Sequence, residues 1–243
     1  MSFREKINGF LEKYFFNPKW KCLSCGKEIF NGENFCKECK KELPFNDKVI
    51  CAHCGREIIA PEDYCSTCKD KLTNVDLSRS AFTYKPPIST LIKELKYKNR
   101  KYLADILSEY LALIYFKNLF APDFITFVPM TKESKKRRKY NQSMLLANGL
   151  SKRVNVIVKD VLIKKEDTVR QVETKSREER FKNLKTAFKV SDKKSVKDKK
   201  ILIVDDVTTT GATGEIIAEK LKSAGAKTVY LLTVASVPPI QKY

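Results

Sequence analysis

The sequence predicts an α/β domain with a doubly wound, mostly parallel sheet, preceded by a small zinc-binding domain. Three observations lead to this prediction. All eight cysteines of the 243-residue chain lie between positions 22 and 68. From position 81 onward, apolar strand candidates alternate with amphipathic helix candidates. One of these strands, at 201–206, ends in two acids, and a turn rich in threonine follows it.

The composition excludes several classes of protein. Apolar residues make up 42% of the chain, enough for a normal core, and no apolar run is long enough to span a bilayer. The first residues carry charges where a signal peptide needs an apolar core, so we expect a cytoplasmic protein without stable membrane insertion. The formal net charge is +19. This excess has two interpretations: a lysine-rich background composition, or a polyanionic partner such as nucleic acid or a phosphorylated metabolite.

The cysteines form four Cys-x-x-Cys pairs in a duplicated unit. A shift of 29 residues places the first two pairs on the last two, and ten residues separate the pairs within each unit. In a cytoplasmic chain this pattern indicates metal and not disulfides, and four thiolates suit a tetrahedral, structural Zn²⁺ ion. Pairing within each unit is favoured over cross-bracing between units, which remains an alternative. His53, the one histidine, is expected to be a knuckle residue and not a ligand. The eight expected ligands of the two zinc ions are Cys22, Cys25, Cys36, Cys39, Cys51, Cys54, Cys65 and Cys68.

The expected domain boundaries follow the composition. Residues 1–20 contain an amphipathic helix candidate, residues 21–75 the zinc-binding domain, and residues 76–243 the α/β domain. Residues 1–75 have a formal charge of only +2, so most of the excess charge belongs to the α/β domain. In that domain we expect strands at 81–84, 125–130, 160–165, 201–206 and 228–236, and helices at 88–98, 101–119, 141–153 and 214–224.

The most informative segment is 201–215. Its strand is expected to leave the sheet at Val204, so that Asp205 and Asp206 follow at the carboxyl end, where α/β sheets bind ligands. The next residues open a helix, whose free N–H groups and dipole favour a phosphate group. Two acids beside a phosphate cradle suit one ligand with a vicinal diol and a phosphate, which is a ribose 5-phosphate. The expected phosphate-binding residues are Thr209, Thr210, Gly211, Ala212 and Thr213.

This segment resembles the motif that binds phosphoribosyl pyrophosphate (PRPP) in type I phosphoribosyltransferases: four apolar residues, two acids and a Thr/Gly-rich turn. The wider chain resembles the ComF (ComFC-type) family, in which a double Cys-x-x-Cys zinc region precedes a phosphoribosyltransferase domain. The resemblance implies PRPP as ligand, with Mg²⁺ near its pyrophosphate. It also implies a role in natural transformation, with single-stranded DNA and other DNA-uptake proteins as partners. The matching stretches are the cysteine array, 81–104, 128–147, 168–190 and 201–213.

Positive charge is concentrated in residues 132–200, which hold 23 Lys and Arg against 9 Asp and Glu. By resemblance, the densest run, just after the strand that ends at Pro129, binds pyrophosphate. Two interpretations are open for the surplus cations: contacts to a DNA backbone, or a solvated charged surface. For the first, Tyr140, Phe181 and Phe188 are candidates for stacking on bases. The run consists of Lys135, Lys136, Arg137, Arg138 and Lys139.

The resemblance adds two further expectations. The polar segment 166–188 resembles the flexible hood loop that covers PRPP in this fold. Lys139 and Tyr140 stand where the family commonly has Gly-Phe, which is a mild departure from its pattern. The hood residues at the family's recurring positions are Thr168, Gln171, Arg177 and Asn183.

The sequence leaves two functions open. One is a PRPP-binding protein that acts in DNA uptake. The other is an active phosphoribosyltransferase of nucleotide or cofactor metabolism that has no role with DNA. No side chain stands out as a general base, because the single histidine lies in the cysteine array. Neither an acceptor substrate nor an oligomeric state can be derived from these motifs.

Overall fold

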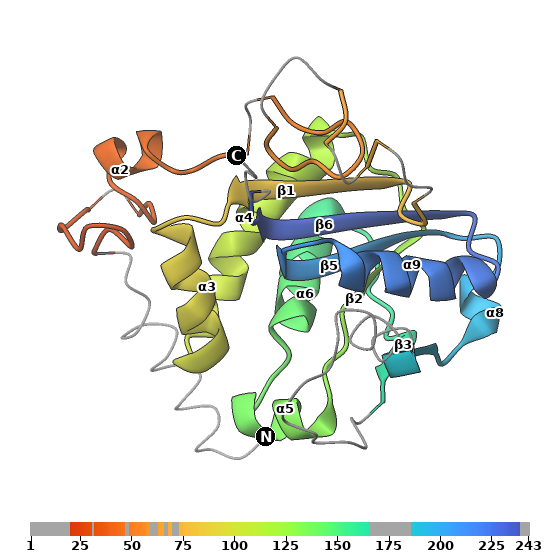
Figure 1. Ribbon diagram of the computed structural model, residues 1–243. Helices are drawn as coiled ribbons and strands as arrows, with labels where there is room; N and C mark the ends of the chain where they lie inside the picture. The colour runs from red at the N-terminus through yellow and green to blue at the C-terminus, as the bar shows by residue number, and fades with distance from the viewer. Residues whose placement is uncertain are drawn as a thin grey trace, which may run out of the picture.

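The computed structural model describes residues 20–30, 32–46, 49–58, 63–65, 68–69, 73–165 and 186–238. Its centre is a four-stranded sheet in the order β1-β6-β5-β2, in which every pairing is parallel (Figure 1). This architecture confirms the predicted α/β class. The strands are β1 (Leu77–Thr83), β2 (Phe124–Phe127), β5 (Lys200–Thr208) and β6 (Thr228–Ser236).

Helices cover both faces of the sheet, as the prediction of a doubly wound fold requires. Alternate residues of β5 explain why both faces need cover. Leu202 and Val204 belong to one apolar core, and Ile201 and Ile203 belong to the other. Helices α3 (Ile88–Tyr97), α4 (Tyr102–Lys117) and α6 (Gln142–Val154) contribute to the first core, and α9 (Ala212–Ser223) contributes to the second (Figure 1).

Two predicted boundaries were wrong at the end of β5. The strand does not leave the sheet at Val204 but stays paired with β6 as far as Thr208 and Ser236. Helix α9 begins at Ala212, two residues before the predicted start at 214. Both acids therefore lie within the strand itself, and Ala212 and Thr213 form the first turn of the helix.

The strand expected at 160–165 does not join the main sheet. It is shortened to β3 (Leu162–Lys164), which pairs antiparallel with β4 (Phe188–Val190) in a separate two-stranded sheet. Leu162, Phe188 and Val190 turn inward to the core beneath α9, while Lys189 is exposed. One-sided burial of this kind suits a small antiparallel ribbon, whereas a strand inside a parallel sheet is buried on both faces.

Three short helices were not predicted. Helix α5 begins after Thr131, whose side chain accepts a hydrogen bond from the Ser134 N–H. It ends at Lys139, which has a left-handed backbone with φ of 68°. A glycine adopts this conformation without cost, which explains why the family's usual glycine falls here. The three helices are α2 (Lys37–Lys41), α5 (Lys132–Arg138) and α8 (Lys193–Val196).

The cysteine region is attached to the sheet along β1. Residues 44–46 run antiparallel to this edge strand: the Asn46 N–H donates to Ala81 O at 3.0 Å, and the Thr83 N–H donates to Pro44 O at 2.8 Å. The rings of Phe45 and Phe82 pack 4.9 Å apart between their centroids. The cysteine region therefore covers an edge that would otherwise expose unpaired backbone groups. Within the described part of the chain, no helix is both long and apolar enough to cross a membrane.

Candidate functional site

Each half of the duplication gathers its own four cysteines. We call residues 20–46 the first cysteine unit and residues 49–69 the second. In each, the four Sγ atoms lie within 4.8 Å of one another, which agrees with the favoured pairing within each unit. Tetrahedral Zn–S bonds of 2.3 Å place sulfurs about 3.8 Å apart. The Cys25–Cys36 distance is 3.9 Å and the Cys54–Cys65 distance is 3.7 Å, so both donor sets fit this ion.

The two acids of β5 lie at the carboxyl edge of the sheet and are held by different helices. Asp206 is only 3% exposed, and its Oδ2 lies 2.7 Å from the Nζ of Lys96 on α3. Asp205 Oδ1 accepts hydrogen bonds from the Ser143 hydroxyl at the start of α6, at 2.7 Å, and from the Asp206 N–H, at 2.8 Å. Two neighbouring carboxylates thus meet the ends of two helices at one point.

This environment makes Asp205 an unusual acid. Burial and the adjacent charge of Asp206 raise its pKa from 3.8 to about 7, although the hydrogen bond from Ser143 and the charge of Lys96 act in the opposite direction. Near neutral pH the ionised form is therefore costly. A ligand that offers hydroxyl donors or a cation at this point relieves that cost.

The turn between β5 and α9 forms the second part of the site. Gly211 caps α9 with φ of 82°, a conformation that favours glycine. The N–H groups of Gly211, Thr213 and Gly214 meet no hydrogen-bond acceptor among the described residues. Such a helix start attracts anions. A hollow of about 30 Å³ lies here, lined by Asp205, Val207, Thr208, Thr209, Gly211, Ala212, Thr213, Gly214, Leu231 and Thr233.

Sequence reasoning missed a side chain that reaches this turn from the second cysteine unit. Arg56 is 7% exposed and donates hydrogen bonds to the carbonyl oxygens of Thr209 and Thr210. One signal was available in the repeat: its counterpart 29 positions earlier is Lys27, so the two units differ at this point. The contact itself depends on how the second unit packs, which the sequence does not state.

Two family models match the chain. The phosphoribosyl transferase domain matches residues 141–240, and the double zinc ribbon domain matches residues 13–72. Among curated proteins, competence protein F of Haemophilus influenzae is 30% identical over 63% of this chain and 69% of its own length. DNA utilization protein YhgH of Salmonella typhimurium is 34% identical over 62% and 67%. The chain belongs to the ComF family.

Further relatives and solved structures are similar to parts of the chain. DNA utilization protein YhgH of Escherichia coli O157:H7 is 36% identical over 60% of the ComF chain, and the match spans 66% of that relative's length. Among solved structures, a glutamine PRPP amidotransferase from B. subtilis aligns with a TM-score of 0.40 and 19% identity, over 54% of this chain and 26% of its own. A hypoxanthine phosphoribosyltransferase from Staphylococcus aureus gives 0.35 and 18%, over 58% and 66%.

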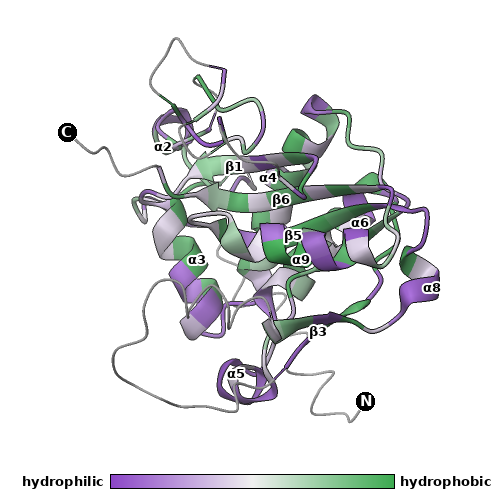
Figure 2. Ribbon diagram, turned by 45° about the vertical axis from the view of Figure 1, so that its right-hand side comes forward, coloured by the Kyte–Doolittle hydropathy of each residue, from purple (hydrophilic) through white to green (hydrophobic). Residues whose placement is uncertain are grey.

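The basic run of this ComF chain forms α5, which follows the carboxyl end of β2. Lys135, Lys136, Arg137 and Lys139 are exposed. Arg138 differs from them, because its guanidinium contacts Gln142 Oε1 at 3.3 Å and lies over the ring of Tyr97. Figure 2 shows that α5 is hydrophilic along its whole length and lies away from the apolar sheet. Four cations are thus left available to an anionic ligand.

Two of the three aromatic residues proposed for base stacking are buried, so the prediction was wrong for them. Tyr140 is 6% exposed, and its hydroxyl donates to the Leu95 carbonyl; Phe188 is 4% exposed. Neither ring can stack on a base, because each is buried in an apolar core. The exposed aromatic residue beside α5 is Tyr97, at 66%, which sequence reasoning missed. Phe181 and the proposed hood residues Thr168, Gln171, Arg177 and Asn183 lie outside the described residues.

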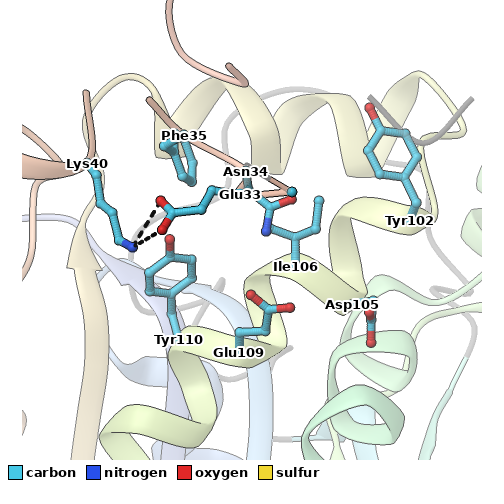
Figure 3. A pocket seen from close by; sticks show the side chains of 10 residues that line it. Glu33, Asn34, Phe35, Lys40, Tyr102, Asp105, Ile106, Glu109 and Tyr110 are labelled. Carbon is cyan, nitrogen blue, oxygen red and sulfur yellow. Dashed lines mark hydrogen bonds and ion pairs between the residues drawn. The ribbon is translucent and has the colours of Figure 1, made fainter. Parts of the chain in front are cut away.

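A separate hollow of about 370 Å³ lies between the first cysteine unit and α4 (Figure 3). Its walls carry the carboxylates of Glu33, Asp105 and Glu109, together with Lys40. Lys40 Nζ lies 3.1 Å from Glu33 Oε2, so the one lysine is already paired. Asp105 and Glu109 are in turn paired with Arg153, at 2.8 Å and 3.3 Å. With its lysine already engaged, this hollow is a poor site for an anionic ligand.

The environment of Asp205 generates a test of the site's electrostatics. Because the folded pKa of about 7 exceeds the ordinary 3.8, the fold is most stabilised by Asp205 below about pH 4, and this stabilisation is lost as the pH rises towards 7. Asp205→Asn keeps an acceptor oxygen and removes the charge. We expect its melting temperature to exceed that of the unaltered protein at pH 8, by about 2–4 °C per kcal/mol recovered, with the difference disappearing at pH 4.

The control for this measurement is Asp160→Asn, which removes an exposed acid outside the site. Calorimetric scans of the three proteins between pH 4 and pH 8 are sufficient. An Asp205→Asn protein that is less stable than the unaltered protein at pH 8 contradicts the assignment of Asp205 as a costly buried charge.

Proposed function

We propose that this ComF-family protein binds PRPP at the carboxyl edge of β5 and handles single-stranded DNA in the cytoplasm during DNA uptake. The observation that carries the proposal is the juxtaposition of Asp205 and Asp206 with the unpaired N–H groups at the start of α9. The names of its relatives, competence protein F and DNA utilization protein, support the second half of the proposal.

In the proposed complex, the 2′- and 3′-hydroxyls of the ribose replace the present partners of the acids. Asp205 gives up its hydrogen bond from Ser143, and Asp206 gives up its ion pair with Lys96. Each carboxylate then accepts hydrogen bonds from the ribose hydroxyls. The 5-phosphate lies against the turn formed by residues 209–213, where backbone N–H groups and threonine hydroxyls donate to it. Mg²⁺ fits this oxygen-rich donor set: Asp205 and Asp206 would lie near it, and it would offset the negative charge of the pyrophosphate.

Replacing the acids tests PRPP recognition. Asp205→Ala together with Asp206→Ala removes both acceptors for the diol, and each lost buried hydrogen bond to a charged group costs about 1.5–3 kcal/mol. We expect calorimetry to show at least a hundredfold loss of PRPP affinity. The control pair Asp105→Ala and Glu109→Ala removes the same charge from the acidic hollow and should leave affinity unchanged. Equal PRPP affinity in the Asp205/Asp206 variant contradicts the proposed site.

The same proteins address turnover. Incubating the unaltered protein with PRPP and a panel of bases, amines and nucleotides, and measuring released pyrophosphate, distinguishes a binding protein from a transferase. Pyrophosphate release that depends on one acceptor would identify a phosphoribosyltransferase, while binding without release would identify a PRPP-responsive module.

We further propose that each cysteine tetrad holds one structural zinc ion. All four positions of each tetrad are thiolates, so no coordination position is left for a substrate. Each unit is also too short to bury a core of its own, and metal binding would supply its folding energy. Metal analysis of the purified protein should give two zinc ions per chain, and a chelator should lower the melting temperature. Fewer than one zinc ion per chain would refute this assignment.

Single-stranded DNA is proposed to lie across α5 and Tyr97. The exposed cations of α5 and the exposed ring of Tyr97 adjoin one another through Arg138, whose Nη2 lies 3.4 Å from Tyr97 Oη. Cations that follow a backbone, next to an aromatic face, are the usual elements of a single-strand site. The cysteine units offer less positive charge, and one of them borders the acidic hollow.

Charge reversal tests this placement. Changing Lys135, Lys136 and Arg137 to Glu should weaken binding of all single-stranded sequences alike and flatten the salt dependence, whose log–log slope is about −0.7 per contacted phosphate. Fluorescence anisotropy with the full chain measures both quantities, and PRPP should compete if the run also borders the pyrophosphate. The matched control reverses three exposed lysines around α8: Lys193, Lys194 and Lys197. Equal loss in the control would show that only net charge matters and would remove α5 as the site.

A further inference from the structure

The second cysteine unit reaches the candidate phosphate turn through one buried arginine. Arg56 Nη1 donates to the Thr209 carbonyl at 3.2 Å, and Nη2 donates to the Thr210 carbonyl at 3.4 Å. A single guanidinium therefore holds two successive peptide groups of the turn. Its rigid fork suits this two-point contact, which a lysine ammonium does not reproduce.

These two carbonyls control the direction of the N–H groups that would face the ligand. In a trans peptide the C=O and N–H bonds point in opposite directions. The Thr209 carbonyl shares its peptide plane with the Thr210 N–H, and the Thr210 carbonyl shares its plane with the Gly211 N–H. By holding both oxygens, Arg56 keeps both N–H groups directed away from itself. Gly211 borders the hollow that Asp205 also lines.

Arg56 is also fixed to the second tetrad. It follows Cys54 by two residues, and its own carbonyl accepts a hydrogen bond from the N–H of Cys51, another member of the tetrad, at 2.8 Å. Arg56 thus has partners on two sides, a zinc-type ligand on one and the candidate phosphate turn on the other. A metal ion that fixes the position of Cys54 would therefore also fix the position of Arg56.

Surrounding contacts hold the second unit in this position. A side chain at Gly55, which has φ of 66°, would meet the Ser78 carbonyl of β1 at 2.6 Å, so the backbone there lies directly on the sheet edge. Glu215, in the first turn of α9, accepts a hydrogen bond from the Asn74 N–H at 2.7 Å, and its Oε1 lies 3.9 Å from His53 Nε2. The start of α9 is therefore held by the second unit, through His53, and by the segment that follows the unit, through Asn74.

Among the described residues, the first unit makes no equivalent contact, although its sequence is the same in outline. Lys27 stands at the position of Arg56 and is exposed. Gly26, the counterpart of Gly55, has no atom within 4 Å of the place where a side chain would begin. The interaction with the phosphate turn is thus a property of one unit and not of the cysteine motif.

We propose that Arg56 is a positioning residue for the phosphate turn, and that through it the second cysteine tetrad is coupled to binding of the ribose 5-phosphate group. The inference rests on the proposed PRPP site and adds to it a residue from a different domain. Coupling of this kind is reciprocal: what the metal does for ligand affinity, the ligand does for metal retention.

The first experiment measures affinity. We expect Arg56→Met to bind Mg²⁺-saturated PRPP and ribose 5-phosphate roughly tenfold more weakly than the unaltered protein, and Arg56→Lys to be intermediate. The control is Arg79→Met, because Arg79 holds the second unit through the Ala52 carbonyl, at 3.0 Å, without contacting the turn. Zinc content and melting temperature of every variant are measured in parallel.

The outcomes separate the two proposals. If the unaltered protein binds no PRPP, both the proposed function and this inference fail. If the unaltered protein binds PRPP and Arg56→Met binds it equally well, only the inference fails. A loss in Arg79→Met as large as that in Arg56→Met also overturns it, because docking of the unit in general, and not Arg56, would then control affinity.

The second experiment measures the coupling directly, beginning with the unaltered protein. Zinc release from the unaltered protein to a coloured chelator is followed with and without Mg²⁺-saturated PRPP. We expect PRPP to slow release of one of the two zinc ions, and this protection to be lost in Arg56→Met but kept in Arg79→Met. Release that PRPP leaves unchanged in the unaltered protein, although calorimetry shows that PRPP binds, would overturn the coupling.

Discussion

The burial of β5 on both faces and both edges is the constraint on which the rest of the molecule depends. The strand is hydrogen-bonded to β2 and to β6, and its side chains from Ile201 to Val204 are buried in two separate cores. Helices must therefore cover both sides. Asp206 is buried beside this core and Asp205 is half-buried, and this environment raises the cost of ionising Asp205. The position of the core thus favours hydrogen-bond donors at the candidate site.

The duplicated cysteine units show how one sequence pattern acquires two roles through its surroundings. The first packs through aromatic side chains, since the ring of Phe35 lies 6.5 Å from that of Tyr110 on α4. The second lies on the edge of β1 and contacts the start of α9 through His53. The cysteines are equivalent in both, and the difference comes from residues beside them. One cysteine unit therefore borders the candidate site, and the other covers α4.

Charged side chains are distributed unevenly over the surface, and this distribution bears on where a polyanion could bind. The carboxylates of the hollow between the first unit and α4 are paired with Lys40 and Arg153, whereas α5 carries exposed cations next to Tyr97. Electrostatic attraction and repulsion both act over about 10 Å at physiological salt. In the proposed complex, a nucleic acid strand would be drawn to the α5 side, near the carboxyl edge of the sheet where the ribose phosphate is proposed to bind.

The sequence by itself determined the α/β class, the two cysteine tetrads and the acid pair with its threonine turn, because each depends on local spacing: a period of two or 3.6 residues, a Cys-x-x-Cys turn, or a strand that runs directly into a helix. Only the tertiary structure decided that β3 pairs with β4 outside the main sheet, that Tyr140 and Phe188 are buried while Tyr97 is open, and that Arg56 holds the turn at Thr209 and Thr210. Arg56 and Thr209 are 153 positions apart in the chain. No local pattern records such a contact, since it exists only after the second unit has packed on the edge of a completed sheet.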